Sequence, residues 1–372
     1  MRAGEQAALG CCSLVALSRA ARNMTDFSFD LGAIDAPKPD DDVALMRLAI
    51  GLADSARTRS SPNPWVGAVV MSSSGEVVGT GATAPVGGPH AEVSALQQAG
   101  EDAVGGTLAV TLEPCCHVGR TPPCTNAIIA SGISRVIVAV TDPDERVAGN
   151  GVTALRDAGI VVETGICESE VHEQLLPYLH HRRTGRPFVL AKIAATLDGH
   201  TAAADGSSQW ITGDRARHDA HRLRAESDAV IVGAGTVRAD DPSLTVRHVE
   251  GRDPMRVVLG AAPVNAKVHP CIEWTSSIEQ LLDELGSKGC LQVLVEGGST
   301  VLGSFYEAGL IDRWAVYLAP GFMGGTASFP LIGTSTHETI DAFTRGRIVS
   351  TRHLDGDVLL LVDPPNQERI ES

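Results

Sequence analysis

One histidine, two cysteines and one glutamate lie in two short motifs whose composition suits a metal-dependent hydrolysis. His90 and Glu92 belong to the segment His-Ala-Glu, and Cys115 and Cys124 belong to the segment 111–124. One imidazole and two thiolates are three zinc ligands, which leave the fourth position open for a water that the metal acidifies. Glu92 is not needed as a ligand and can carry protons between that water and a departing amine. The sequence therefore predicts a catalytic zinc site for deamination.

The spacing of the two cysteines leaves a second interpretation open. Eight residues separate Cys115 from Cys124, whereas paired zinc cysteines are commonly about two to four residues apart. The neighbouring Cys116 and His117 could supply a fourth protein ligand, in which case the zinc would be structural. A structural site has no use for the carboxylate of Glu92, so the catalytic interpretation is favoured.

The predicted ligands must be brought together by the ends of strands and helices. Cys115 follows an apolar run that predicts a buried strand, and Cys124 lies in the first turn of the helix that Pro122-Pro123 opens. Residues two apart on a regular helix point in different directions. His90 must therefore be the cap of its helix if Glu92 is to face the same metal.

Apolar runs alternate with helical segments along most of the chain, which is typical of an α/β layer structure. In the first half we expect helices over 43–57, 90–98, 122–130, 152–158 and 168–183, and strands over 66–71, 77–81, 107–112, 136–140 and 160–164. In the second half we expect strands over 188–192, 229–232, 256–259, 292–295 and 314–318, two more within 345–362, and helices over 214–226, 277–285 and 300–308.

The length of the chain predicts two domains. At 372 residues it exceeds what one ordinary hydrophobic core organises. We expect an N-terminal extension over 1–38 that is disordered, a deaminase domain over 39–184, and a second domain over 185–372, with Gly185-Arg-Pro187 at the boundary. The apolar stretch near the N-terminus is too short to span a bilayer.

Charge and cysteine usage limit the partners and the setting. A net charge of −15 argues against a protein that follows nucleic acid, because neutralising phosphates needs a basic face. The eight cysteines do not form the framework of a small disulfide-stabilised domain. We therefore expect reduced thiols, a cytoplasmic location, a small-molecule substrate, and neither a nucleic-acid nor a membrane partner.

Further motifs accompany the metal segment in both halves. The first half contains Asn63-Pro64, Val66-Gly67, His90-Ala-Glu92, Glu113-Pro-Cys115, Gly119-Arg-Thr-Pro-Pro-Cys124 and Asp142-Pro143. The second contains Lys192, Leu197-Asp-Gly199, Ser208-Gln-Trp-Ile-Thr212, Leu223-Arg-Ala225, Thr236-Val237, the run from Asp240 to Arg247, and Val295-Glu-Gly-Gly-Ser299. Over about 40–363 the chain resembles the bifunctional deaminase–reductases of riboflavin biosynthesis.

The resemblance implies a cytidine-deaminase-like αβα domain followed by a dihydrofolate-reductase-like α/β domain. The implied reactions are hydrolytic deamination of a phosphoribosylamino-pyrimidinone and NADPH-dependent reduction of its ribosyl group to ribityl phosphate. The implied cofactors are Zn²⁺ and NADPH, the substrate is a small phosphorylated pyrimidine, and the chain is expected to form a homo-oligomer, a dimer or larger.

The resemblance also implies roles for single residues. In the first half it implies zinc ligands at His90, Cys115 and Cys124, a proton shuttle at Glu92, and substrate contacts at Asn63, His117 and Arg120. In the second half it implies substrate contacts at Ser208, Arg224, Leu244, Arg247 and Glu296, and cofactor contacts at Ala194, Trp210, Thr236, Asp240, Gly298, Ser299 and Thr300.

The residue chemistry of the second half agrees with these roles. Two arginines suit a sugar phosphate, and a glycine-rich turn between a strand and a helix suits a pyrophosphate. No G-x-G-x-x-G follows a first strand, so a Rossmann cofactor domain is not supported. For Trp210, a wall for the nicotinamide and ordinary core packing both stay open.

Three departures from the family pattern leave alternatives open. Asp144 stands where the family usually has Asn, which adds an acid near a pocket meant for phosphate. Segment 260–265 lacks an arginine often found near the adenosine 2′-phosphate. A preference for NADH over NADPH and a weakly active reductase therefore stay open as alternatives. Cys116 replaces a more usual Ser. A nucleic-acid deaminase is disfavoured by the charge and by the complete second half.

Overall fold

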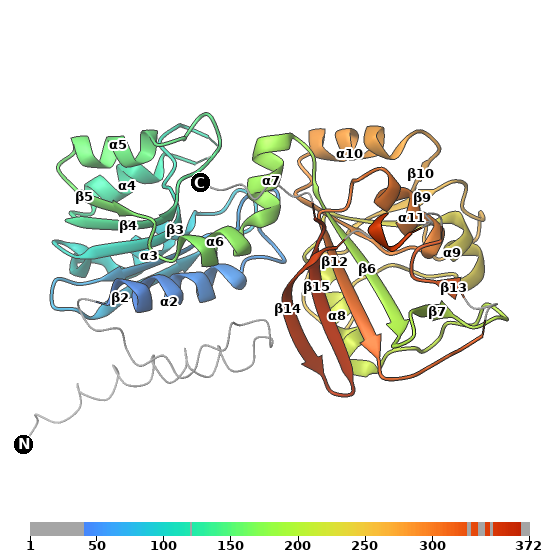
Figure 1. Cartoon of the computed structure of the whole chain (residues 1–372). Coiled ribbons are helices and arrows are strands. Elements are labelled where there is room, and N and C mark those ends of the chain that lie inside the picture. Colours follow the sequence, from blue (N-terminus) through green and yellow to red (C-terminus); the bar gives the residue numbers. More distant parts are fainter. Residues whose placement is uncertain (1–40, 120, 326–328, 334–338, 343–344, 366–372) are drawn as a thin grey trace, which may run out of the picture.

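Two lobes lie side by side in the computed structural model (Figure 1). The structure describes residues 41–119, 121–325, 329–333, 339–342 and 345–365. The predicted extension over 1–38 lies outside these residues. The first lobe is built around a five-stranded sheet and the second around an eight-stranded sheet, while the exact domain boundary at 184 and 185 stays a prediction. None of the helices in the described part of the chain is long and apolar enough to cross a membrane.

The sheet of the first lobe is mixed. Its strand order is β2-β1-β3-β4-β5, with β1 antiparallel to both neighbours and β3, β4 and β5 parallel. The bounds are β1 Gly67–Met71, β2 Val77–Ala82, β3 Thr107–Leu112, β4 Arg135–Val140 and β5 Val161–Thr164. Each predicted strand of this half is present, and the nearly complete burial of β1, β3 and β4 follows from helices on both faces.

Helices cover both faces of this sheet. A Cβ at Gly67 of β1 would lie 1.9 Å from the carbonyl oxygen of Ala49 in α2 (Asp42–Asp54). A Cβ at Gly81 of β2 would lie 2.1 Å from the carbonyl oxygen of Ala91 in α3 (Ala91–Ala99). Because Gly81 pairs with the residue after Gly67, the two glycines face opposite sides of the pleat. Helices α4 (Cys124–Ala130) and α5 (Asn150–Asp157) lie on the α3 side, which gives the predicted αβα layers; a 3₁₀ turn covers Gly100–Ala103.

The prediction of one linking helix over 168–183 is wrong. Two helices are present, α6 (Glu168–Gln174) and α7 (Leu176–Thr184). Pro177 lies in the first turn of α7, where it cannot donate a hydrogen bond to the carbonyl four residues earlier. The chain therefore breaks at Leu175 and turns toward the second lobe.

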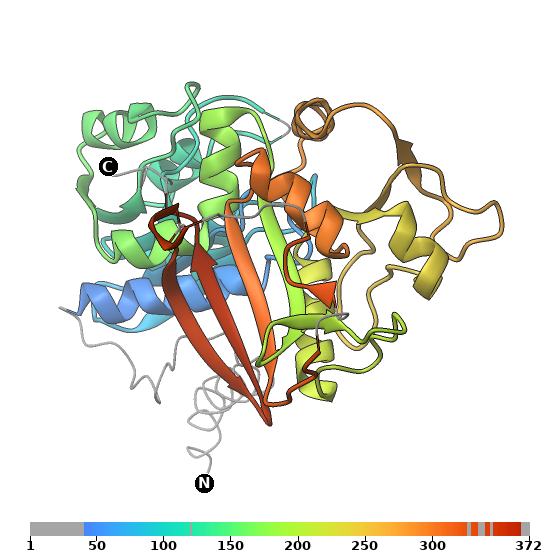
Figure 2. The same cartoon turned by 45° about the vertical axis from the view of Figure 1, so that its right-hand side comes forward.

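The sheet of the second lobe is parallel except at one edge. Its order is β10-β9-β8-β11-β6-β12-β15-β14, and only β15 and β14 run antiparallel to their neighbours. The bounds are β6 Phe188–Thr196, β8 Ala229–Gly233, β9 Met255–Leu259, β10 Ile272–Trp274, β11 Gln292–Val295, β12 Arg313–Ala319, β14 Arg347–Leu354 and β15 Asp357–Asp363. Figure 2 brings the red β14 and β15 forward at this edge.

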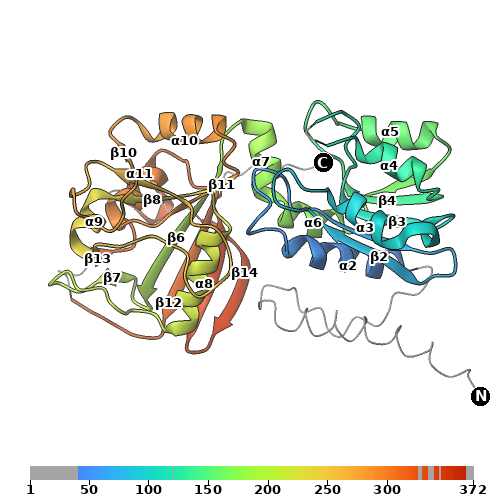
Figure 3. The same cartoon turned by 180° about the vertical axis from the view of Figure 1, so that it is seen from behind.

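Helices also cover both faces of the second sheet. Along β6, Val189, Ala191 and Ile193 pack with α10 (Ile278–Ser287) and α11 (Ser299–Glu307). Leu190 and Ala194 pack on the other face, beside α8 (Asp214–Ala225), which lies in front of the sheet in Figure 3. This period of two confirms the predicted α/β layering.

Four short elements were not predicted. They are α9 (Ala234–Asp240), β7 (His200–Ala202), β10, and β13 (Phe329–Pro330), and a 3₁₀ turn covers Ile340–Ala342. The three strands have two or three residues each, none of which is fully buried. Segments of this kind carry no apolar periodicity, so sequence patterns do not reveal them.

Candidate active sites

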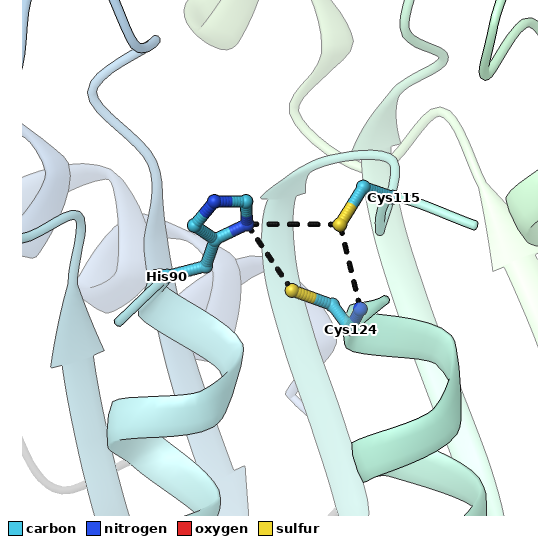
Figure 4. A group of neighbouring side chains, drawn as sticks. All are labelled: His90, Cys115 and Cys124. Carbon is cyan, nitrogen blue, oxygen red and sulfur yellow. Dashed lines mark hydrogen bonds between the residues drawn. The ribbon is translucent and has the colours of Figure 1, made fainter. Parts of the chain in front are cut away.

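The predicted metal ligands come together in the first lobe. The donor atoms of His90, Cys115 and Cys124 all lie within 4.8 Å of one another. Figure 4 shows the three side chains converging from the start of α3, the end of β3 and the start of α4. His90 Nδ1 is 3.7 Å from Cys115 Sγ and 3.3 Å from Cys124 Sγ. Tetrahedral zinc places a nitrogen and a sulfur ligand about 3.6 Å apart, so these residues fit the metal.

Local structure aims each ligand. His90 is the N-cap of α3, in an extended conformation, as the shared orientation with Glu92 requires. Cys124 is the first residue of α4, and its backbone N–H donates to Cys115 Sγ at 3.4 Å. Hydrogen bonding with Cys124 lowers the pKa of the Cys115 thiol. A thiolate in this position is the form that binds a metal.

A fourth protein ligand is not part of this group. Among the residues that the structure describes, the cluster holds His90, Cys115 and Cys124 alone. The Sγ of Cys116 lies 3.6 Å from the carbonyl oxygen of Arg146 instead. The geometry therefore favours a zinc with an open position over a closed structural zinc.

Glu92 lies beside the predicted metal ligands and lines the same pocket. Its side chain is 4% exposed, and His90, Glu92 and Cys115 all line the pocket. Burial raises the pKa of the Glu92 carboxyl, which favours a carboxyl that holds a proton during part of a catalytic cycle.

The rest of the pocket wall contains predicted and unpredicted residues. Asn63 and His117, both predicted, line it, whereas Arg120 lies outside the described residues. Arg146 and Arg182 also line the pocket and were not predicted. Both lie on segments that look like an ordinary solvated loop and helix in sequence. Only the packing of α7 against this lobe brings Arg182 to the pocket.

The acidic departure at Asp144 is neutralised by these arginines. Arg146 Nη2 lies 2.6 Å from Asp144 Oδ2, and Arg182 Nε lies 3.9 Å from the same oxygen. Hydrogen bonds from Arg146 hold the pKa of Asp144 at about 2. Arg146 and Arg182 thus balance the charge that Asp144 adds, so this departure does not by itself exclude an anionic substrate.

The buried carboxyl of Asp142, which also lines the pocket, should make the stability of the protein depend on pH. Burial raises the pKa of Asp142 from 3.8 to about 6, although the Tyr178 hydroxyl donates to it. The folded protein therefore holds this proton to higher pH than the unfolded chain, and the resulting stability is present below pH 3.8 and lost as the pH rises through about 6. We compare the free energies of unfolding of Asp142→Asn and wild type. As the pH rises from about 4 to about 8, the difference should shift in favour of the variant by on the order of 2 kcal/mol. Urea unfolding at both pH values measures this, and a pH-independent difference would contradict it.

In the second lobe the predicted Arg224 and Glu296 form a buried ion pair. Arg224 Nε and Nη2 donate to Glu296 Oε1 and Oε2 at 2.6 and 2.8 Å. The side chains are 13% and 11% exposed. Burial alone would raise the pKa of Glu296, but Arg224 outweighs it and holds the pKa at about 2. Glu296 therefore neutralises most of the charge of Arg224.

Lys192 is a functional candidate that was not assigned a role. It lies on β6, and Glu296 and Arg224 are close enough to act on its charge. Burial lowers the pKa of the Lys192 ammonium. Its Nζ lies 5.8 Å from the centre of the Tyr317 ring. A lysine inside an apolar strand was the sequence signal that could have identified it.

The other predicted substrate residues of this lobe differ in how they are placed. Arg247 is exposed, and its Nη1 donates to the hydroxyls of Ser243 and Thr245 at 2.6 and 3.1 Å. Leu244 is 3% exposed and packs in a hydrophobic cluster beside α9. Its side chain therefore faces the core, and only its backbone, held at φ 53°, can face a ligand. Ser208 is half-buried in the loop after β7.

The predicted cofactor residues gather around the turn between β11 and α11. Gly298 is the N-cap of α11, and Ser299 and Thr300 form its first turn. A Cβ at Gly298 would lie 3.8 Å from the Thr236 hydroxyl at the start of α9. β8 and β11 are neighbouring parallel strands, so the glycine-rich turns that follow them meet at one sheet edge. Free backbone N–H groups at such a turn fit a pyrophosphate.

The remaining cofactor candidates lie on other elements. Ala194 is on β6 and Asp240 ends α9. Trp210 is 70% exposed, with the Arg217 guanidinium 4.6 Å from its ring centre. This exposure excludes core packing for Trp210, which was one of its two interpretations.

The geometry defines a class of protein. An αβα lobe with three converging zinc-type donors and a buried glutamate is joined to an α/β lobe with a glycine-rich strand-to-helix turn and a buried Arg224–Glu296 ion pair. This is the arrangement of a zinc-dependent deaminase fused to a nucleotide-dependent reductase.

Comparisons with known proteins agree in both halves. The family model of the cytidine and deoxycytidylate deaminase zinc-binding region matches residues 39–140, and the model of the RibD C-terminal domain matches residues 187–360. The riboflavin biosynthesis protein RibD of Escherichia coli K12 is 38% identical over 358 residues, covering 85% of this chain and 97% of its own length. The RibD of Mycobacterium tuberculosis H37Rv is 44% identical over 292 residues, with 75% and 85% covered.

Solved structures show the same architecture. Acinetobacter baumannii RibD has 38% identity and a TM-score of 0.82, covering 87% of this chain and 98% of its own. A Thermotoga maritima diaminohydroxyphosphoribosylaminopyrimidine deaminase/5-amino-6-(5-phosphoribosylamino)uracil reductase has 36% identity, a TM-score of 0.80 and the same coverage. The chain belongs to the RibD family of bifunctional deaminase–reductases of riboflavin biosynthesis. Its cytidine-deaminase-like and dihydrofolate-reductase-like domains, its zinc and its NADPH dependence are those predicted from the sequence.

Proposed function

We propose that the first lobe deaminates 2,5-diamino-6-(5-phosphoribosylamino)pyrimidin-4-one and that the second reduces the ribosyl group of the product to ribityl phosphate. The observation that carries the first reaction is the convergence of His90, Cys115 and Cys124 beside the buried Glu92. Support for the substrate comes from the T. maritima relative, whose two activities act on these compounds by name.

Glu92 carries the protons of the deamination. When bound by the two thiolates and the imidazole, zinc lowers the pKa of the attacking water. Glu92 accepts a proton from that water on a carboxylate oxygen and passes it to the pyrimidine ring nitrogen. A second transfer through the same carboxylate reaches the exocyclic amine, which leaves as ammonia while the ring carbon gains a carbonyl oxygen.

The far wall of the pocket binds the rest of the substrate. Asn63 and His117 face the same space as Glu92, and we assign them to the pyrimidine and ribose. The guanidinium groups of Arg146 and Arg182 line the pocket, and we assign them to the phosphate, because a guanidinium group donates two parallel hydrogen bonds to phosphate oxygens. Arg120, three residues after His117 in the sequence, stays in our proposal as a further phosphate ligand.

In the second lobe the chain's own residues bind and protonate the substrate. When bound, NADPH supplies the hydride to the first carbon of the opened ribosyl chain. Lys192 Nζ can donate a proton to the ring oxygen as the ring opens, and its lowered pKa makes that transfer easier. Glu296 orients Arg224 and can accept from sugar hydroxyls. Within the described residues, the hydrogen bonds of the Arg247 guanidinium go to the neutral hydroxyls of Ser243 and Thr245, so we assign this guanidinium to the phosphate.

One incubation tests both reactions. Zinc-loaded protein is mixed with the diaminopyrimidinone substrate and NADPH, and the products are identified by mass. We expect the ribitylamino-pyrimidinedione phosphate, and only the deaminated ribosyl compound when NADPH is left out. A chelator-treated sample should retain reduction of the deaminated compound and lose deamination. A deaminated product that still carries ribose in the presence of NADPH would overturn the proposal for the second lobe.

We also propose a cytoplasmic homo-oligomer as the working form. The support for the setting is that the six cysteines of the described residues are free thiols, which suits a reducing compartment. The support for the oligomer is the resemblance to the family, in which a dimer through the second domain is expected.

A further inference from the structure

The loop that carries Asn63 is attached to the second lobe. Ser61 directly precedes the pocket-lining residues Pro62 and Asn63. It is 9% exposed, and its hydroxyl donates to Asp228 Oδ1 at 2.5 Å. Asp228 lies immediately before β8 of the second sheet. A wall of the deaminase pocket is thus hydrogen-bonded to the other lobe.

Asp228 is itself held rigidly. Its Oδ2 accepts from the backbone N–H groups of Leu291 and Gln292, at 2.7 and 3.2 Å. Its own N–H donates to the carbonyl oxygen of Gln292 at 2.9 Å, and its carbonyl accepts from Met255 at 2.9 Å. The carboxylate is therefore built into the start of β9, β8 and β11, which are three adjacent strands of the sheet.

Two neighbours strengthen this attachment. Arg252 donates to Asp228 and, through Nη1, to the carbonyl oxygen of Ser61 at 3.3 Å. Leu291 of the second lobe is 1% exposed and packs in the hydrophobic core of the first. Charge, hydrogen bonds and apolar packing thus converge on the Ser61 loop, so the loop cannot shift without disturbing the second sheet.

We propose that Asp228 is a positioning residue for deamination: it fixes the Ser61–Asn63 loop, so that the second lobe completes the substrate pocket of the first. This inference rests on the proposed function, in which Asn63 contacts the pyrimidine substrate. A loop that is fixed before binding needs no ordering when substrate arrives. Its release weakens ground-state and transition-state binding together, which raises KM and leaves kcat nearly unchanged.

The test measures deamination by the full-length zinc enzyme without NADPH, so that the second reaction does not contribute. We expect Ser61→Ala to raise the KM about fivefold, equivalent to about 1 kcal/mol, and to change kcat less than twofold. Asp228→Asn keeps a carbonyl oxygen that can accept from the N–H groups of Leu291 and Gln292. The oxygen that accepts from the Ser61 hydroxyl becomes an amide nitrogen, which cannot accept. This variant should raise the KM by a similar factor. The double variant should raise the KM no further than the single variant with the larger effect, because both changes remove the same hydrogen bond.

A matched control separates positioning from general loosening of the two lobes. Glu173 of α6 forms an ion pair with Arg313 of β12, which also joins the two lobes, and neither residue lines the pocket. Glu173→Gln should leave the KM within twofold. Reduction of the deaminated compound should be unchanged in Ser61→Ala.

Three results would overturn the inference. They are an unchanged KM in Ser61→Ala, additive effects in the double variant, or an equal rise in Glu173→Gln. Asn63→Ala serves as the reference for the proposed function. If it raises KM while Ser61→Ala does not, the positioning role fails and the proposed site stands; if wild type does not deaminate at all, the proposed function itself fails.

Discussion

Replacing Glu92 by Gln is expected to slow deamination about 10³-fold. The amide has nearly the same shape as the carboxylate, so the pocket keeps its form, but it cannot accept a proton from water or return one to the leaving amine. The three zinc donors are other side chains, so we expect the variant to bind one zinc per chain, like wild type. Steady-state release of ammonia and metal analysis measure the two quantities.

The second reaction provides the internal control for this variant. Glu92 belongs to the first lobe, and the reduction of deaminated substrate by NADPH should proceed at the wild-type rate. A Glu92→Gln protein that deaminates within tenfold of wild type would show that the protons travel by another route. Loss of zinc together with activity would show instead that Glu92 holds the metal site together.

Replacing Arg224 by Met is expected to lower the free energy of unfolding by about 3–5 kcal/mol. The change leaves the carboxylate of Glu296 in a site where it is 11% exposed and has lost both hydrogen bonds from the guanidinium group. NADPH-dependent reduction should fall below detection, because Arg224 and Glu296 form the wall of the proposed substrate site. Chemical denaturation of the second lobe and NADPH oxidation measure these effects.

A double variant distinguishes a lost charge balance from lost packing. The double variant Arg224→Met with Glu296→Gln removes both charges of the pair and leaves Lys192, whose pKa burial already lowers, as a buried titratable group beside them, so part of the lost stability should return. Reduction should stay absent, because the polar wall of the pocket is gone in either case. If the double variant is as unstable as the single one, the ion pair is not what stabilises this site.

Much of the fold follows from local patterns in the sequence. The apolar runs before Cys115 and after Pro187 predict β3 and β6, and the turn at Asp355-Gly356 correctly separates β14 from β15. The helix over 168–183 was predicted without its break, because the apolar pattern continues through Pro177 and conceals the missing hydrogen bond. The short strands β7 and β13 were missed, because they exist only through pairing with each other across a long stretch of the chain. The strand β10 was missed because its three residues are too few to show an alternating apolar pattern.

The metal site was predictable because the residue types alone select the chemistry. Zinc accepts few combinations of ligands, so His90, Cys115 and Cys124 together with Glu92 restrict the reaction before any coordinates are known. The position of His90 as a helix cap also follows from the direction that Glu92 must take. These inferences use chemistry and local geometry, which a sequence contains directly.

Other parts of the sites depend on contacts between distant segments, which only the tertiary structure decided. Arg146 and Arg182 meet at Asp144 because α7 packs beside the loop after β4. Arg224 forms an ion pair with Glu296 because the end of α8 faces the end of β11. Ser61 reaches Asp228 across 167 residues because the two lobes pack together. The sequence by itself determined which chemistry this protein performs, since ligand type and helix geometry are local properties. The structure decided which charges remain free for substrate and what holds each pocket wall, since these depend on strand order and on packing between the lobes.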